Sequence, residues 1–218
     1  VRRASNAELP QVRVIPLAAA LPGPGGPIPR RAPPEPSPEP TVLFVGYLLN
    51  RRHLPDLVRG FAGVQRRHPS VRLEIVGDDR TFPAQDLGAV TSAEGVGDRV
   101  RIRSYVPDDT LAGLYSRASA FAFLSEYEGF GLTPLEALAA GVPVLAGDTH
   151  VAQEVCGGAA LYVDTSDVSG ITARLETILF DAGVRSTLLA EAGAVLDRYS
   201  WERTGLETLA ALTEAARA

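Results

Sequence analysis

Two glutamates and a glycine-rich loop form the stretch of this sequence that is best suited to chemistry. Seven residues separate Glu128 from Glu136, and Gly129 and Gly131 follow the first glutamate closely. Glycine permits a tight turn and lets a ligand approach the backbone. An apolar run over residues 120–124 precedes the loop. The pattern therefore predicts a strand that leads into a loop with room for a ligand.

The residues after the loop predict a helix. Thr133 suits the N-cap, Pro134 the first helical position and Glu136 the third position after the cap. Residues 135–140 favour helix, and Gly141 can end it. Free backbone amides and the dipole at a helix N-terminus favour an anion. We therefore expect a phosphate group to bind where the loop enters the helix.

Three residues of this stretch each have a structural alternative. Glu136 can be the reciprocal half of a capping box with Thr133 instead of a ligand-facing carboxylate. Glu128 can be an ordinary solvated loop carboxylate, and Phe130 between two glycines favours packing over catalysis. The spacing of the two glutamates leaves these alternatives open.

A pair of arginines, Arg51 and Arg52, follows another apolar run at residues 41–46. A hydrogen bond to a charged group contributes roughly 1.5–3 kcal/mol, whereas a helix N-terminus contributes about 0.3–1 kcal/mol to an exposed anion. A guanidinium can make two such bonds to one phosphate. The arginines should therefore dominate phosphate binding, with the helix amides orienting the group. The alternative is a solvated basic turn.

Strand-length runs alternate with helical patterns from residue 41 to the C-terminus. Expected strands span residues 41–46, 71–76, 100–103, 120–124, 142–146 and 159–163. Expected helices span residues 54–68, 84–94, 111–118, 135–140, a short segment around 152, 168–180, 184–196 and 201–216. This alternation predicts an α/β domain with a doubly wound, parallel, Rossmann-like sheet. Ligands of such sheets lie beyond the carboxyl ends of the strands. The rim there should carry Gly46, Gly77, Tyr105, Ser125 and Gly147.

Composition narrows the class of protein. The chain has 218 residues, enough for one α/β domain with a linker, and a net charge of -5 that argues against nucleic-acid binding. No apolar run approaches the length of about 20 residues that a membrane-spanning helix needs. Residues 1–10 lack the apolar core of a signal peptide. Because the sequence has no methionine, we expect it to begin inside a longer product, after processing, or at the edge of an expressed fragment. Its single cysteine, Cys156, fits a reducing compartment and a small buried side chain. No cluster of His, Cys and Asp has metal-ligand spacing.

Ten of the seventeen prolines fall within residues 16–40. This composition predicts a stiff, extended connector, with a binding segment for a PxxP-recognising partner as the alternative. Residues 12–15 before it alternate like a strand.

Taken together, the motifs closely resemble those of one family, the glycosyl transferases group 1. They are EGFGL at 128–132, LEA at 135–137 and GVPV at 141–144. The resemblance runs from about Thr41 to the C-terminus and implies the nucleotide-sugar-binding lobe of a two-lobe, GT-B-type enzyme. On this basis residues 1–17 hold the last strand of an N-terminal lobe and 18–40 the linker. Residues 41–198 form the nucleotide-sugar-binding domain, and 199–218 a helix that packs back across the lobes.

The resemblance implies sugar transfer from a nucleotide-diphosphate sugar to an acceptor hydroxyl, with retention at the anomeric carbon and without a metal or other cofactor. Glu128 would approach the donor sugar as the catalytic residue, and Glu136 would bind the ribose hydroxyls. Tyr105 and Val106 would lie beside the base, largely through backbone contacts, with a packed aromatic as the alternative for Tyr105. The full donor-binding set that it implies is Arg51, Arg52, Glu136, Gly129, Phe130, Gly131, Leu132, Thr133, Tyr105, Val106 and Gly46.

Two departures from the family pattern occur beside the arginines. His53 replaces the usual asparagine, and Tyr47 stands where many members carry another arginine. The division of labour between Arg51 and Arg52 therefore stays open. Glu154 matches a recurrent family glutamate, for which a capping or supporting role is expected.

The expected partners are a nucleotide sugar, a carbohydrate, lipid-linked or other hydroxyl acceptor, and an N-terminal lobe in the same chain or a partner. The expected location is the cytoplasm, with peripheral contact at the inner membrane surface. A non-catalytic nucleotide-binding or scaffold subunit is the first alternative function. A nucleotide-sugar epimerase of related fold is the second.

Overall fold

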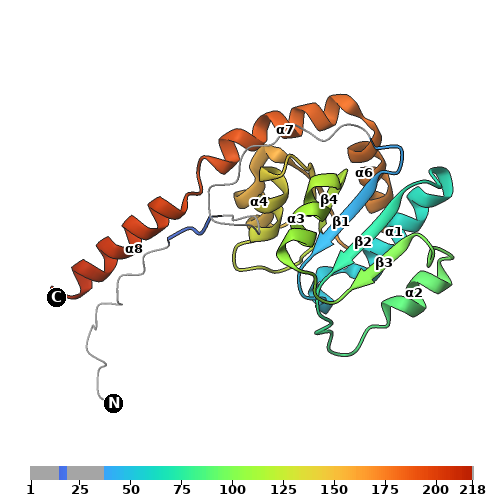
Figure 1. Cartoon of the computed structure of the whole chain (residues 1–218), viewed down its shortest axis with the longest axis horizontal. Helices are drawn as coiled ribbons and strands as arrows, with labels where there is room; N and C mark the ends of the chain where they lie inside the picture. The colour runs from blue at the N-terminus through green and yellow to red at the C-terminus, as the bar shows by residue number, and fades with distance from the viewer. Residues whose placement is uncertain (1–14, 19–36, 218) are drawn as a thin grey trace, which may run out of the picture.

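The computed structural model describes residues 15–18 and 37–217 and is built on one parallel sheet (Figure 1). Its strands are β1 (Thr41–Val45), β2 (Arg72–Val76), β3 (Val100–Arg103), β4 (Ala120–Phe123), β5 (Val144–Gly147) and β6 (Ala160–Val163). They lie in the order β3-β2-β1-β4-β5-β6. The predicted doubly wound α/β sheet is thereby confirmed. The order reverses between β1 and β4, and ligands of such sheets bind at this switch point.

Helices cover both faces of the sheet. They are α1 (Leu54–Arg67), α2 (Leu87–Ala93), α3 (Asp108–Arg117), α4 (Leu132–Ala139), α5 (His150–Cys156), α6 (Val168–Phe180), α7 (Ala182–Leu196) and α8 (Trp201–Ala215), with short 3-10 turns η1 (Asn50–Arg52) and η2 (Gly157–Ala159). No helix of the described residues is both long and apolar enough to cross a membrane.

The alternating side chains of β1 divide the core into two layers. Val42 and Phe44 pack in one cluster with Phe61 of α1 and residues of α6. Leu43 points the other way and joins a second cluster that includes Leu135 of α4 and residues of α7. A central parallel strand is buried on both faces, and this explains why it is a continuous apolar run in the sequence.

The helix after the glycine loop begins earlier than its capping pattern predicts. Gly131, at φ 104°, is the N-cap residue of α4, so Leu132 is the first helical residue and Thr133 lies inside the helix. The predicted N-cap at Thr133 is therefore wrong, because the glycine adopts the left-handed conformation that turns the chain into the helix. The predicted end is confirmed: the N–H groups of Gly141 and Val142 donate to carbonyls of the last turn, at 3.0 and 2.9 Å.

Three other helices also begin at residues other than the predicted ones. Helix α7 begins at Ala182 instead of 184, because Asp181 caps it. Helix α2 begins at Leu87 instead of 84, because Asp86 caps it by accepting from the Ala89 N–H at 2.9 Å. Helix α3 begins at Asp108 instead of 111, directly after Pro107, and carries two aspartates in its first turn. Acidic side chains in the first turn interact favourably with the helix dipole and stabilise the start of the helix.

Helix α8 extends away from the sheet, and none of its residues is buried (Figure 1). Ser200 caps it by accepting from the Arg203 N–H. Thr204 of this helix donates to the carbonyl of Pro16 at 2.6 Å, so residues 15–18 lie beside it. Most of the predicted strand at 12–15 and most of the predicted linker at 18–40 lie outside the described residues.

Candidate functional site

The loops that follow β1 and β4 are joined to each other at the switch point of the sheet. The N–H of Glu126 donates to the carbonyl of Arg51 at 2.9 Å, and Arg51 Nε donates to the carbonyl of Tyr127 at 2.7 Å. Residues that lie about 75 positions apart in the sequence are thus joined by one backbone–backbone hydrogen bond and one bond from an arginine side chain to a backbone carbonyl. This pairing places the predicted arginines beside the predicted catalytic loop.

The carboxylate of Glu128 lies at the centre of these contacts. Its Oε1 accepts from Arg52 at 2.9 Å (Nη2) and 3.0 Å (Nε), and from the Ser125 hydroxyl at 2.8 Å. Its Oε2 lies 3.4 Å from Arg51 Nη2. Only 13% of its side chain is exposed, so the alternative of a solvated loop carboxylate is wrong. The structure brings Glu128, Arg51 and Arg52 together on one edge of the sheet, as the topology predicts.

Arg52 has a donor left over after it has paired with Glu128. Its Nη1 is buried and has no hydrogen-bond partner among the described residues, while 12% of the whole side chain is exposed. This nitrogen lies over Gly46, where a Cβ would stand 2.0 Å from it. A side chain at position 46 would therefore occupy the place of the guanidinium. A buried donor without an acceptor costs free energy, and an incoming oxygen ligand would remove that cost.

Glu136 lies in a different environment, between α4 and α3. Its Oε2 accepts from the hydroxyl of Tyr115 at 2.8 Å. Burial raises the pKa of the Glu136 carboxyl, and the hydrogen bond from Tyr115 opposes that rise. Because the carboxylate is turned toward Tyr115 and α4 begins at Leu132 without a side-chain cap, the capping-box alternative is wrong.

The loop between the two glutamates has an accessible backbone at one glycine and a phenylalanine ring that is packed against the protein. A Cβ on Gly129 would meet no atom within 4 Å, so the backbone there is accessible. Phe130 packs edge-on against Tyr199 at 5.3 Å between ring centroids, which confirms the packing interpretation. No side chain of the described residues caps the start of α4, at Leu132 and Thr133. The first amides of α4 are thus not satisfied by a capping side chain.

The predicted base-binding residues fall into two types. Tyr105 is 76% exposed on the rim, so the alternative of a packed aromatic is wrong. Val106 is buried, and its side chain packs in the second core cluster. Only backbone groups of Val106 can therefore reach a ligand.

Three contacts of the site were missed by sequence reasoning. Ser125 bonds to Glu128 three residues later, and that short spacing is a signal that could have identified it. His53 lies 3.1 Å from Asp56 and 3.4 Å from Glu126 through its two ring nitrogens. The Tyr115–Glu136 pair has no local signal, since its members lie 21 positions apart with a strand between them.

A hollow of about 490 Å³ opens beside Glu128, between the loops after β4 and β5. Its lining consists of Glu126, Tyr127, Glu128, Asp148, Thr149, His150, Val151 and Gln153. Seven of these eight residues have polar side chains, and the volume lies within the range of about 300–1,000 Å³ that is typical of small-molecule sites.

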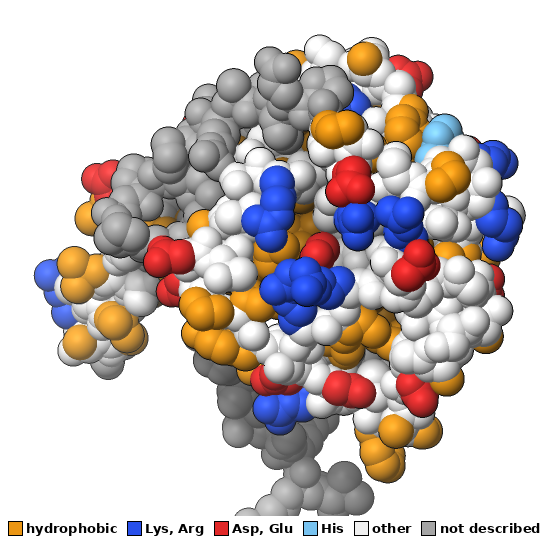
Figure 2. Space-filling view, turned by 45° about the vertical axis from the view of Figure 1, so that its right-hand side comes forward, with side chains coloured by type: hydrophobic (Ala, Val, Ile, Leu, Met, Phe, Trp, Pro, Cys, Tyr) orange, Lys and Arg blue, Asp and Glu red, His pale blue; other side chains and the backbone are white. Residues whose placement is uncertain are grey.

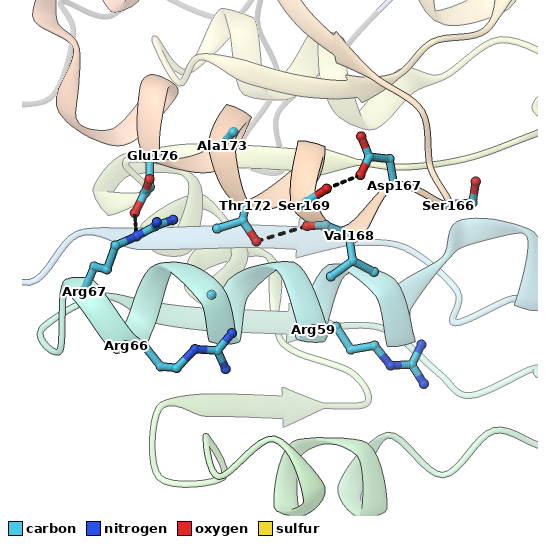
Figure 3. A pocket seen from close by; sticks show the side chains of 11 residues that line it. Arg59, Arg66, Arg67, Ser166, Asp167, Val168, Ser169, Thr172, Ala173 and Glu176 are labelled. Atoms are coloured by element: carbon cyan, nitrogen blue, oxygen red, sulfur yellow. Dashed lines mark hydrogen bonds and ion pairs between the residues drawn. The ribbon is translucent and has the colours of Figure 1, made fainter.

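A larger hollow of about 800 Å³ lies between α1 and α6, away from the predicted site residues (Figure 3). Arg59, Arg66 and Arg67 of α1 line it together with residues of α6, and Arg67 reaches toward Glu176. Arg67 pairs with Glu176, and Arg59 pairs with Asp56 at 2.8 Å. Arg66 lies 4.0 Å from Glu94, so each of the three arginines has a carboxylate of the chain nearby, and none of the predicted site residues lines the hollow.

On the face shown in Figure 2, charges of both signs are interspersed. All 21 basic residues of the sequence are arginines, and on the face in Figure 2 they alternate with carboxylates around exposed apolar side chains. Among the described residues no group of three or more His, Cys, Asp and Glu side chains is arranged to hold a metal ion.

Comparison with known proteins points to one family. The sequence profile of the family described as glycosyl transferases group 1 matches residues 28–192. O-antigen chain mannosyltransferase B of Escherichia coli is 39% identical over 174 residues, which are 77% of this chain and 44% of that protein. GDP-mannose:cellobiosyl-diphosphopolyprenol alpha-mannosyltransferase of Komagataeibacter xylinus is 36% identical over 125 residues, 57% of this chain and 32% of that protein.

Solved structures with a similar fold include enzymes that transfer sugars or are named for sugar-phosphate synthesis. Sucrose-phosphate synthase of Thermosynechococcus elongatus superposes with a TM-score of 0.72 at 26% identity, over 83% of this chain and 46% of that chain. The pneumococcal O-GlcNAc transferase GtfA, solved with UDP and GlcNAc, has a TM-score of 0.77 at 16% identity, over 96% and 41%. At that identity the likeness concerns the fold alone. The chain spans less than half the length of each of these four proteins.

Proposed function

Because the chain belongs to the glycosyl transferases group 1 family, we propose that it serves the transfer of a sugar from a nucleotide-diphosphate sugar to an acceptor hydroxyl, with retention at the anomeric carbon. In this proposal the described domain binds the donor, and an N-terminal lobe of the same protein or a partner binds the acceptor. The family match favours transfer over the epimerase alternative.

The observation that carries the proposal is the unpaired donor of Arg52 beside the Glu128 carboxylate. Breaking the bond between the anomeric carbon and the phosphate oxygen places negative charge on the diphosphate and positive charge on the sugar. Arg52 Nη1, the Arg51 guanidinium and the first amides of α4 can stabilise the first charge. Glu128 lies between the arginines and the open hollow, where it can stabilise the second charge. Such preorganised charges act most strongly in the transition state.

The remaining groups would orient the donor. The Glu136 carboxylate would accept hydrogen bonds from the ribose hydroxyls, and exposed Tyr105 would lie beside the base. The hollow beside Glu128 would hold the sugar. These roles need no metal ion, because the cationic groups of the chain itself face the diphosphate.

Mannose is the first sugar to test. The Escherichia coli relative is named a mannosyltransferase, and the names of two others, from Komagataeibacter xylinus and Mycolicibacterium smegmatis, specify GDP-mannose. The acceptor in the proposal is a carbohydrate, a lipid-linked sugar or another hydroxyl compound. A lipid-linked acceptor would bring the protein from the cytoplasm to the inner membrane surface as a peripheral protein.

A thermal-shift screen of GDP, UDP and ADP, each alone and as its nucleotide sugars, tests the donor assignment. A ligand that binds the folded state raises the melting temperature, by an amount that grows with the logarithm of its concentration relative to its dissociation constant. We expect GDP and GDP-mannose to raise the melting temperature of the chain. If no nucleoside diphosphate does so at millimolar concentration, the proposed function is wrong.

A further inference from the structure

Tyr115 is the one hydrogen-bond partner of the Glu136 carboxylate among the described residues. The bond measures 2.8 Å from the phenol oxygen to Oε2, and it occupies one of the two carboxylate oxygens. A hydroxyl–carboxylate bond of this kind is stronger than one between neutral groups. The second oxygen, Oε1, is left for another donor.

The phenol itself is held rigidly. Tyr115 lies on α3, its side chain is fully buried, and its ring stacks on Phe121 of β4 at 5.8 Å between ring centroids. Both residues belong to the same core cluster. Because the ring is packed on all sides, its hydroxyl defines a fixed point to which the Glu136 side chain is attached.

We propose that Tyr115 is a positioning residue for nucleotide binding: its hydroxyl holds Glu136 Oε2 so that Oε1 faces the ribose hydroxyls of the donor. The inference rests on the proposed function, since it assigns a purpose to the second carboxylate of that site. A glutamate side chain that is fixed before binding loses less rotamer freedom when the ligand arrives.

The same hydrogen bond sets the charge of the carboxylate. Burial raises the pKa of Glu136, and the bond from Tyr115 lowers it. Among the described residues, Tyr115 is the titratable group that affects Glu136; Arg51 and Arg52 pair with Glu128 instead. Loss of the hydroxyl leaves burial unopposed, so Glu136 would become protonated at a higher pH. A protonated carboxyl is a poorer acceptor for two ribose hydroxyls.

The substitution Tyr115→Phe removes the hydroxyl and keeps the packed ring. Isothermal titration should compare the ribonucleoside diphosphate that the chain binds, GDP first, with its 2′,3′-dideoxy counterpart. We expect Tyr115→Phe to weaken ribonucleotide binding by about threefold to tenfold, the net effect of one hydrogen bond, and to leave dideoxynucleotide binding unchanged. The matched control is Tyr162→Phe, whose hydroxyl donates to the Gly157 carbonyl at 2.7 Å outside the site.

A pH series separates positioning from general loosening of the fold. The ratio of ribonucleotide to dideoxynucleotide affinity should fall on the acid side, and in Tyr115→Phe that fall should begin at a higher pH than in the unsubstituted chain. The titration of the phosphates cancels in this ratio. Equal weakening of both nucleotides, unchanged ribonucleotide affinity or an unmoved acid limb would each overturn the role of Tyr115. Failure of the unsubstituted chain to bind any nucleoside diphosphate would overturn the proposed function and this inference with it.

Discussion

Glu128 and Glu136 stand eight positions apart on one loop and helix, yet the fold places them in opposite electrostatic surroundings. Glu128 accepts from two guanidinium groups and a hydroxyl that reach it from three positions on two loops. Glu136 meets one neutral donor, and burial raises its pKa. The contrast shows that a pair of identical side chains can be assigned to separate tasks by their neighbours. One carboxylate is suited to meeting developing charge, and the other to holding hydroxyl groups.

The largest expected effect follows from removing the charge of Glu128. In the complete enzyme, Glu128→Gln should lower turnover by about 100-fold or more, because a preorganised charge at the reacting centre typically contributes that much. The amide has nearly the shape of the carboxylate, so the dissociation constant of the nucleoside diphosphate should change by less than about threefold. Release of nucleoside diphosphate from the nucleotide sugar measures turnover, and isothermal titration measures affinity. Glu202→Gln, exposed on α8, is the matched control. Loss of affinity at normal turnover would remove Glu128 from the chemistry.

An intermediate effect should separate the two arginines that surround Glu128. Arg52 is nearly buried and contacts the carboxylate at 2.9 Å, whereas Arg51 is 38% exposed and contacts it at 3.4 Å. Arg52→Ala should therefore weaken nucleoside diphosphate binding about tenfold or more, and Arg51→Ala only about threefold, since 1.4 kcal/mol is tenfold in affinity.

Titration calorimetry on the two variants decides the division of labour. Arg59→Ala, which breaks a surface pair with Asp56 on α1, is the control and should bind normally. Equal losses in the two site variants, or a greater loss in Arg51→Ala, would contradict the ranking.

The smallest expected effect concerns stability and tests the surroundings of Glu136. A carboxyl whose pKa is raised above its ordinary value of 4.5 by folding binds protons more tightly in the folded state. Its contribution to stability is therefore greatest below that ordinary value and declines as pH rises through the folded-state pKa. The free energy of unfolding of the unsubstituted chain should fall, relative to Glu136→Gln, as the pH rises above that ordinary value. Urea unfolding at several pH values measures it. Parallel curves for the two proteins would show that Glu136 does not titrate abnormally.

The spacing of apolar residues predicted the fold well, because the central strands are continuous apolar runs and several helices have a clear apolar stripe at helical spacing. The strand at residues 100–103 and the helix at 168–180 were predicted with their observed bounds. The start of α4 was missed because Thr133, Pro134 and Glu136 imitate a capping sequence while Gly131 makes the turn. A local pattern of cap residues cannot show which of two overlapping turns the chain will adopt.

The contacts of the site likewise fall into those that the sequence could predict and those that it could not. Arg52 and Glu128 lie 76 positions apart in the sequence. Their contact could be predicted because the loops at the carboxyl ends of parallel strands lie at the same edge of the sheet. The bond between Tyr115 and Glu136 depends on how α3 packs against the sheet and α4, which no spacing in the sequence records. Topology can place residues on a rim, but side-chain packing decides which of them touch.

The hydrogen bonds between residues 51 and 126–127 have a consequence for how this protein tolerates change. The turn after β1 and the loop after β4 cannot change conformation independently, because each accepts a hydrogen bond from the other through a backbone carbonyl. Substitutions in the two segments should therefore show epistasis instead of simple addition. A variant that reshapes one loop for a new donor will need a compensating change in the other, although the two segments lie far apart along the gene.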